Sequence, residues 1–135
     1  MHLAILRARP EIEAVVHAHS TFATALACHD RGIPAFHYMV AVAGGHDIRC
    51  AGYATFGTRE LGEGAVAALA GRRACLLSHH GMLALGGSLA AALALAVEVE
   101  TLARQYWHAL ALGEPPRLDD AEMDRVLRKF ESYGR

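Results

Sequence analysis

The chain has 135 residues, enough for one compact domain with its own hydrophobic core and too few to divide comfortably, so we expect a single domain over residues 1–135. Its 13 lysines and arginines nearly balance 14 aspartates and glutamates, which excludes a strongly basic surface that binds nucleic acid or an anionic membrane. Hydrophobic residues make up 53% of the chain, a share that indicates a globular protein and favours an oligomer.

Cysteine spacing and the distribution of apolar residues indicate a soluble, cytoplasmic protein. The cysteines are odd in number, widely spaced and outside any C-x-x-C pattern, which is typical of reduced, buried thiols rather than of a disulfide framework. They are Cys28, Cys50 and Cys75.

The first ten residues lack the pattern of a signal peptide. The most apolar stretch, residues 82–97, is interrupted by two glycines and ends at Glu98, too short for a bilayer span.

Helix and strand patterns alternate along the chain. Alanine- and leucine-rich runs predict helices, and short apolar runs bounded by turn residues predict strands. The predicted elements are, in chain order, a helix at 2–8, a strand at 13–19, a helix at 22–30, an extended or mixed segment at 33–42, a strand at 48–53, a helix at 59–70, strands at 74–80 and 82–85, and helices at 89–112 and 121–134. This alternation predicts a three-layer α/β or α+β domain, with the strand order left open.

Polar residues with capping potential stand before most of the predicted helices. The candidate N-caps are Ser20 or Thr21, Thr58, Ser88 and Asp119. Glu122, three positions after Asp119, gives that helix a start that resembles a capping box. The first helix has no capping residue ahead of it, so the chain begins as if inside a helix.

Two histidines on the first predicted strand form a candidate chelating pair. Side chains in a strand alternate between its faces, so His17 and His19, separated by Ala18, project from the same face. The strand ends directly after them at Ser20, where pockets commonly form. An H-x-H pair is a weak signal in a chain with nine histidines, so a third ligand is needed to support a metal site.

The best candidate for the third ligand is His80. It ends the apolar run ACLLSHH directly before Gly81, which allows a sharp turn and a close approach of the backbone, whereas His79 points to the other face. Three neutral imidazoles with an open fourth position are typical of catalytic zinc sites, while structural sites usually close with four ligands. The remaining histidines are interpreted as surface, core or supporting residues: His2, His29, His37, His46 and His108.

With these residues in place, the sequence resembles the class II aldolase/adducin family over nearly its whole length, and within it most closely the L-fuculose-phosphate aldolases. The resemblance is carried by five segments. They are AVVHAH at 14–19, IPAFHYMVAVAGG at 33–45, YATFGTREL at 53–61, LLSHHGMLA at 76–84 and KFESYG at 129–134.

The resemblance implies a three-layer α/β/α fold with a mostly antiparallel sheet and a homotetramer with zinc, or another divalent cation, at subunit interfaces. It implies that His17, His19 and His80 bind the metal. It also implies that Tyr38 donates a proton from a neighbouring subunit and that Tyr133 positions the aldehyde. The reaction implied is cleavage of a sugar phosphate such as L-fuculose 1-phosphate to dihydroxyacetone phosphate and L-lactaldehyde through a metal-stabilised enediolate.

The sequence departs from the family pattern at its start. The catalytic glutamate and the phosphate-binding loops of the family lie upstream of the matching segment, and neither Glu11 nor Glu13 fits the glutamate's motif. The chain is therefore expected to be N-terminally truncated, as the C-terminal two thirds of the family domain, whether as a fragment, through a wrongly chosen start codon or as a short relative. Two alternative functions remain: a sugar-phosphate 4-epimerase of the same superfamily, and a non-catalytic adducin-like scaffold.

Overall fold

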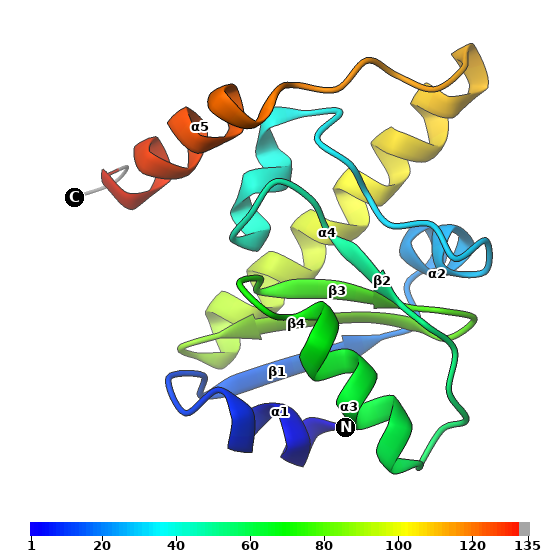
Figure 1. Ribbon diagram of the computed structural model, residues 1–135, viewed down its shortest axis with the longest axis vertical. Coiled ribbons are helices and arrows are strands. Elements are labelled where there is room, and N and C mark those ends of the chain that lie inside the picture. The colour runs from blue at the N-terminus through cyan, green and yellow to red at the C-terminus, as the bar shows by residue number, and fades with distance from the viewer. Residues whose placement is uncertain (133–135) are drawn as a thin grey trace.

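An open four-stranded sheet forms the centre of the protein in a computed structural model, which describes residues 1–132 (Figure 1). The strands are β1 (Ala14–Ala18), β2 (Arg49–Ala51), β3 (Ala74–Leu77) and β4 (Gly81–Gly86). Their order across the sheet is β1-β4-β3-β2. β4 is antiparallel to both β1 and β3, while β2 runs parallel to β3. The prediction of a mostly antiparallel central sheet is confirmed.

Helices cover both faces of this sheet. The helical elements are α1 (His2–Ala8), α2 (Thr21–Ala27), the 3₁₀ helix η1 (Tyr38–Ala43), α3 (Arg59–Ala68), α4 (Leu89–Ala109), the short 3₁₀ turn η2 (Leu110–Leu112) and α5 (Asp120–Ser132). Figure 1 shows α1 and α3 below the sheet and α2, α4 and η1 above it, with α5 farthest from the sheet. The architecture is therefore the predicted three-layer α/β/α arrangement.

Each face of the sheet contributes to a separate hydrophobic core. Because side chains alternate along β4, Met82 and Ala84 belong to the cluster under α4, whereas Leu83 and Leu85 belong to the cluster that includes Ile5. Both clusters are closed to solvent, and β3 and β4 are buried along their full length. This two-sided burial fixes the register of the central strands, since a slip of one residue would exchange the two faces.

Three of the predicted helix caps form. The Thr58 hydroxyl accepts a hydrogen bond from the Leu61 amide at the start of α3. The Ser88 hydroxyl accepts one at the start of α4, and an Asp119 carboxylate oxygen accepts one from the Glu122 amide, 2.7 Å away, at the start of α5. As predicted, α1 begins without a side-chain cap.

The N-terminus of α2 is capped from another helix. Ser20 is the N-cap residue, but its side chain accepts no cap hydrogen bond. Instead, the amides of Phe22 and Ala23 each donate to one oxygen of the Glu100 carboxylate on α4, at 2.9 Å in both cases. A carboxylate is a strong acceptor for these free amides because it also interacts favourably with the positive end of the helix dipole.

We therefore expect Glu100→Ala to destabilise the protein by about 1.5–3 kcal/mol, since it leaves two amides without their charged acceptor. Glu100→Gln keeps one acceptor oxygen and should lose less than the alanine variant. Urea denaturation of the three proteins would measure the difference, and equal midpoints for all three would contradict this role for Glu100.

The segment predicted at 33–42 as extended or mixed is of mixed structure, with a strand bridge at its start and a 3₁₀ helix in its second half. Ile33 makes a single antiparallel bridge to Ile48, after which η1 begins at Tyr38. A ring nitrogen of His37 accepts a hydrogen bond from the Met39 amide, and Gly44 ends the helix with a φ of 92°. The continuous apolar run has no periodicity that separates a buried strand from a buried helix.

The cysteines are all free thiols, as predicted, but they are not all buried. Cys28 is exposed after the end of α2, which corrects the expectation of three small core residues. Burial raises the pKa of Cys50 to about 11 and that of Cys75 to about 12. Both remain protonated near neutral pH and are therefore poor nucleophiles.

Helix α5 is held on the domain by a histidine between two aspartates. Nδ1 of His46 lies 3.1 Å from a carboxylate oxygen of Asp120, and Nε2 lies 2.7 Å from one of Asp124. The hydrogen bond to Asp124, followed by that to Asp120, raises the pKa of His46 above its ordinary value. Only the protonated ring donates from both nitrogens.

This contact predicts a pH-dependent docking of α5. A raised pKa in the folded state means that the contribution of His46 is complete below pH 6.5 and is lost as the pH rises through the higher folded value. Amide hydrogen exchange in α5, corrected for the intrinsic pH dependence, should therefore accelerate as the pH rises from 6.5 through the raised pKa of His46. The variant His46→Gln should show no such change; an identical acceleration in that variant would contradict the assignment.

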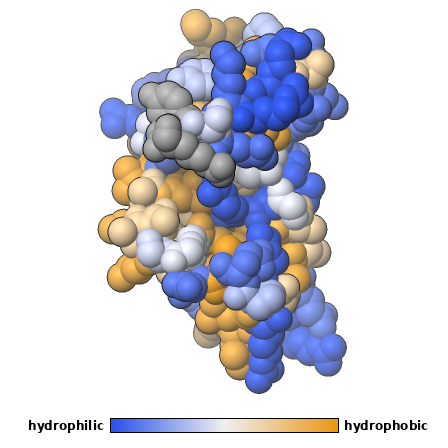
Figure 2. Space-filling model, turned by 90° about the vertical axis from the view of Figure 1, so that its left-hand side faces the viewer, coloured by the Kyte–Doolittle hydropathy of each residue, from blue (hydrophilic) through white to orange (hydrophobic). Residues whose placement is uncertain are grey.

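Apolar side chains are exposed on the side of the molecule that Figure 2 presents. On α4, Leu89, Leu93 and Val97 follow one another at four-residue spacing and are 69%, 53% and 60% exposed. Residues at this spacing form one stripe along a helix, here called the α4 stripe. Within residues 1–132, no helix is long and apolar enough to cross a membrane.

Candidate metal centre

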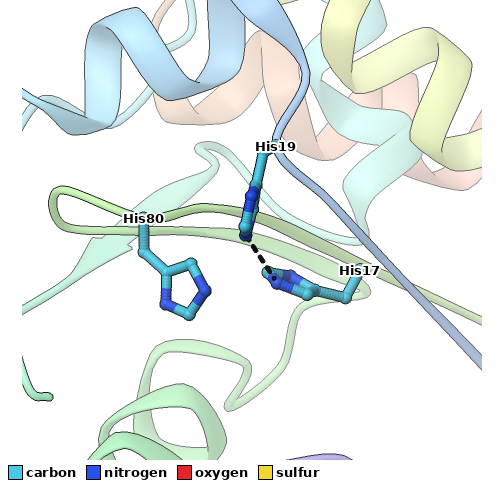
Figure 3. Close-up of side chains that lie close together, drawn as sticks. All are labelled: His17, His19 and His80. Carbon is cyan, nitrogen blue, oxygen red and sulfur yellow. Dashed lines mark hydrogen bonds between the residues drawn. The ribbon is translucent and has the colours of Figure 1, made fainter. Parts of the chain in front are cut away.

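Three histidine side chains converge at one end of the sheet (Figure 3). One nitrogen from each of His17, His19 and His80 lies within 4.8 Å of the corresponding nitrogens of the other two. The ring centroids are 4.9 Å apart in all three pairs. The three residues that the sequence selected as candidate ligands are thus brought together.

Strand β1 delivers two of these rings. His17 lies opposite Leu83 of β4, and the pairing ends with Ala18 opposite Met82. The strand ends at Ala18, one residue earlier than predicted, so His19 is the first residue beyond it. The ring of His19 still turns to the same side as that of His17. The alternation of an extended backbone therefore accounts for this half of the cluster.

A backbone carbonyl orients the ring of His17. Its Nδ1 lies 2.9 Å from the carbonyl oxygen of Met82, a group that can only accept, so Nδ1 carries the proton. Nε2 is then free of hydrogen and points to the cluster, 3.1 Å from Nε2 of His19. Metal-binding histidines commonly donate their second ring nitrogen in this way, which fixes both tautomer and orientation.

The turn between β3 and β4 delivers His80. β3 ends at Leu77, earlier than predicted, and the His80 amide donates to the Leu77 carbonyl at 3.0 Å. The left-handed backbone conformation in this turn falls on His79, with a φ of 52°, whereas Gly81 was expected to provide the sharp turn. The ring of His79 lies against Tyr53 and outside the histidine cluster.

Gly81 permits the predicted close approach of the backbone, here between two strands, although the sharp turn falls on His79. A Cβ atom at this position would lie 2.4 Å from the carbonyl oxygen of Ala18 and 2.9 Å from the ring of His19. Real Cβ atoms do not come so close to a backbone oxygen. The absence of a side chain at Gly81 therefore lets β4 start directly beside the strand that carries His17 and His19.

The surroundings of two of the three rings favour their neutral form. Partial burial lowers the pKa of His17. The hydrogen bond to the Met82 carbonyl raises this pKa, and the neighbouring histidines lower it further. Burial also lowers the pKa of His80, with a smaller effect from His19. Neutral imidazole is the form that coordinates metal ions, so the lowered pKa values of His17 and His80 favour metal binding by these two residues.

The donor set fits a divalent cation of the zinc type. Zinc–nitrogen bonds are about 2.0–2.1 Å long, so nitrogens on one tetrahedral zinc ion lie roughly 3.3 Å apart. The His17 and His19 nitrogens are already 3.1 Å apart. A small rotation of side chains would bring His80 within range, and three imidazoles leave a fourth position for a substrate oxygen.

Tyr38, one of the two predicted catalytic tyrosines, is not part of this cluster. Tyr38 is half exposed at the start of η1, stacked on His37 with ring centroids 4.9 Å apart and near Phe130 of α5. Tyr133 lies outside the described residues. The roles that the family resemblance gives to both tyrosines remain predictions.

Sequence reasoning missed the groups that support the ligands. The role of the Met82 carbonyl cannot be predicted from the sequence, because every residue has a backbone carbonyl. Glu100 binds the helix that follows His19 from a position 78 residues away in the chain. His2 was treated only as a generic histidine, yet its ring packs edge-on against that of His17, with centroids 6.1 Å apart. Such contacts depend on tertiary structure.

Comparisons with known proteins agree with this geometry. Residues 1–107 match the model of the class II aldolase and adducin N-terminal domain. The chain is 61% identical over 133 residues to the 5-methylthioribulose-1-phosphate/5-deoxyribulose-1-phosphate aldolase of Rhodospirillum rubrum, covering 98% of this chain and 60% of that protein. It is 52% identical over 134 residues to the L-fuculose phosphate aldolase of Escherichia coli K12, covering 98% and 62%.

A solved structure of an L-fuculose 1-phosphate aldolase shares the fold, with a TM-score of 0.92 and 48% identity over 96% of this chain and 61% of that one. This chain thus spans about 60% of the length of the curated relatives it matches. The family match covers most of the chain and includes all three histidines. The chain belongs to the class II aldolase and adducin family.

Proposed function

We propose that this chain acts as a metal-dependent aldolase that cleaves a ketose 1-phosphate. The observation that carries the proposal is the convergence of three imidazole nitrogens within 4.8 Å: one from β1, one from the residue directly after β1 and one from the β3–β4 turn. The family of this chain supports the same reaction class, because the relatives at 61% and 52% identity are named as sugar-phosphate aldolases.

In this proposal His17, His19 and His80 hold a divalent cation, with zinc as the first candidate because all three ligands are imidazoles. When bound, such a cation supplies a Lewis acid that offsets negative charge on the substrate's oxygens. The Met82 carbonyl keeps the proton of His17 on Nδ1, which reserves Nε2 for coordination.

A tyrosine hydroxyl is proposed to exchange a proton with the C4 oxygen of the substrate. It accepts this proton as the C3–C4 bond breaks and donates it to the aldehyde oxygen in the reverse, condensation direction, while in cleavage a separate proton must reach C3 of the enediolate. Tyr38 is the candidate, acting from a neighbouring subunit, and its half-exposed position on η1 leaves it accessible to such a partner. Tyr133 is proposed to position the aldehyde. Proton transfer of this kind requires the hydroxyl within hydrogen-bond reach of the reacting oxygen, which a single chain does not supply here.

The substrate class is proposed from shared chemistry. L-fuculose 1-phosphate, 5-deoxyribulose 1-phosphate and 5-methylthioribulose 1-phosphate all carry a ketone at C2 and hydroxyls at C3 and C4. Cleavage between C3 and C4 yields dihydroxyacetone phosphate in each case, with L-lactaldehyde as the second product from the first substrate. The relatives at 61% and 52% identity differ in the named substrate, so all three sugars are candidates.

The test is to incubate the zinc-loaded chain with each sugar and to measure dihydroxyacetone phosphate with a coupled dehydrogenase. We expect release of this product with at least one sugar and none with His80→Ala. A zinc-loaded, folded chain that releases none of it from any of the three would contradict aldolase activity in this chain.

The same incubation distinguishes the two alternatives. A sugar-phosphate 4-epimerase would leave the mass of the substrate unchanged while the C4 epimer appears in the chromatogram. A non-catalytic scaffold would assemble and leave every substrate intact.

We also propose that the chain forms a homo-oligomer, with a tetramer as the expected state. The exposed α4 stripe supports this, because apolar surfaces of this kind are typical of protein–protein contacts. Light scattering after size-exclusion chromatography would give the mass, and a monomer at all concentrations tested would contradict the proposal.

A further inference from the structure

We infer that Asp30 and Ser78 are positioning residues that fix the turn carrying His80 and so set the third ligand of the metal centre. This inference rests on the proposed metal site. Neither residue belongs to the histidine cluster. The argument starts from their contact: the Ser78 hydroxyl donates to an Asp30 carboxylate oxygen across 48 residues of sequence.

Ser78 is buried, with 3% of its surface exposed, and is the only buried polar or charged residue in the described part of the chain. A buried hydroxyl without a partner is costly, so its hydrogen bond to Asp30 is needed where it stands. Ser78 also continues the sheet, because its amide donates to the Ala51 carbonyl at 3.0 Å. The residue therefore joins β2, the turn and the end of α2.

A second hydrogen bond joins the same two segments. The Ala27 carbonyl at the end of α2 accepts from the amides of both Asp30 and His79, at 3.0 and 3.1 Å. The turn after α2 and the β3–β4 turn are thus bonded through one backbone contact and one side-chain contact. Together these two contacts form what is here called the α2 clamp.

The clamp coincides with two unfavourable backbone conformations. Asp30 has a φ of 54° and His79 a φ of 52°, and within residues 1–132 they are the only non-glycine residues with positive φ. Such conformations persist where surrounding contacts enforce them. The position of His79 in the left-handed region decides where the chain places His80, the next residue.

The position of the His80 ring depends on this turn, whereas His17 has two supports of its own. His17 is held by strand pairing and by the Met82 carbonyl. Within the described residues, by contrast, no hydrogen bond holds the ring of His80, so the turn itself determines where its nitrogens lie. Metal ligands must be held to within a fraction of an ångström, which makes the clamp relevant to affinity.

Helix α2 consequently connects both parts of the site. It begins directly after His19, where Glu100 caps it, and its end holds the His80 turn through Ala27 and Asp30. Besides the pairing of β1 with β4, this short helix of seven residues therefore links the segment that carries His17 and His19 to the turn that carries His80.

The test compares two variants of Asp30. Asp30→Gly tolerates the positive φ but removes the acceptor, whereas Asp30→Asn keeps an acceptor oxygen and also tolerates this conformation. We expect Asp30→Gly and Ser78→Ala each to weaken Zn²⁺ binding about tenfold, in a competition with a chromophoric chelator. Asp30→Asn should stay within a factor of about three of the unmodified chain, and the double variant should lose no more than either single variant.

Asp47→Asn provides the control for general destabilisation. Asp47 pairs with Arg72 at 2.7 Å, ahead of β3 and so at the other end of that strand from His80. It should lower the melting temperature while leaving Zn²⁺ affinity unchanged. The visible spectrum of bound Co²⁺ should change in Ser78→Ala and stay constant in the control.

The outcomes separate the two claims. If the unmodified chain binds zinc and Asp30→Gly and Ser78→Ala bind it equally well, the clamp has no positioning role and this inference is wrong, while the proposed site stands. If the unmodified chain binds no zinc, both claims fail. Should Ser78→Ala not fold, the comparison of Asp30→Gly with Asp30→Asn decides the question alone.

Discussion

We expect His17→Ala to abolish stoichiometric zinc binding at micromolar concentrations. The change removes one of three nitrogens that lie within 4.8 Å of one another. Zinc sites with four protein ligands bind with about 10–16 kcal/mol, so one ligand contributes about 3 kcal/mol, or about a hundredfold in affinity. Isothermal titration of the metal-free chain with Zn²⁺ would measure the loss.

The control for this variant is His29→Ala. His29 is exposed and lies outside the cluster, so its removal should leave both stoichiometry and affinity unchanged. Equal zinc binding by His17→Ala and the unmodified chain would show that these imidazoles hold no metal.

The second large effect is expected from Gly81→Ala. The added methyl group would lie 2.4 Å from the Ala18 carbonyl oxygen and 2.9 Å from the His19 ring, so β4 and β1 must separate or His19 must move. Overpacking of this kind costs about 1–3 kcal/mol. Because the displaced group is itself a proposed ligand, urea denaturation should show lower stability and zinc titration a weaker affinity in the same variant.

Gly64→Ala is the matched comparison. Gly64 lies inside α3, where a Cβ would meet no atom within 4 Å. Alanine is a better helix former than glycine, so this variant should gain about 0.5–1 kcal/mol of stability with unchanged zinc affinity. If Gly64→Ala lost as much stability as Gly81→Ala, the contact with Ala18 would not explain why alanine is unfavourable at position 81.

The sequence allowed the candidate ligands to be predicted because their placement depends on local rules. Alternation along an extended strand places His17 and His19 on one side, and an apolar run that ends before a glycine marks His80 as a residue at a strand terminus. The antiparallel pairing of β1 with β4 then brings the segment with His17 and His19 next to the segment with His80. The three layers and three of the four proposed helix caps followed from similarly local patterns.

What could not be predicted depends on contacts between distant segments. The cap of α2 comes from Glu100 rather than from Ser20, and the hydroxyl of Ser78 meets the carboxylate of Asp30. The 3₁₀ helix η1 could not be told from an extended segment, because a continuous apolar run has no contrast between faces in the sequence. The positive φ of the β3–β4 turn falls on a histidine where glycine seemed the natural choice.

The most direct measurement is an anomalous-scattering map, recorded at the zinc absorption edge from crystals of the chain grown with zinc. A single strong peak per chain, within about 2.0–2.1 Å of nitrogens from His17, His19 and His80, is the expected result. A zinc peak elsewhere, or three rings with no peak between them at saturating zinc, would contradict the proposed centre.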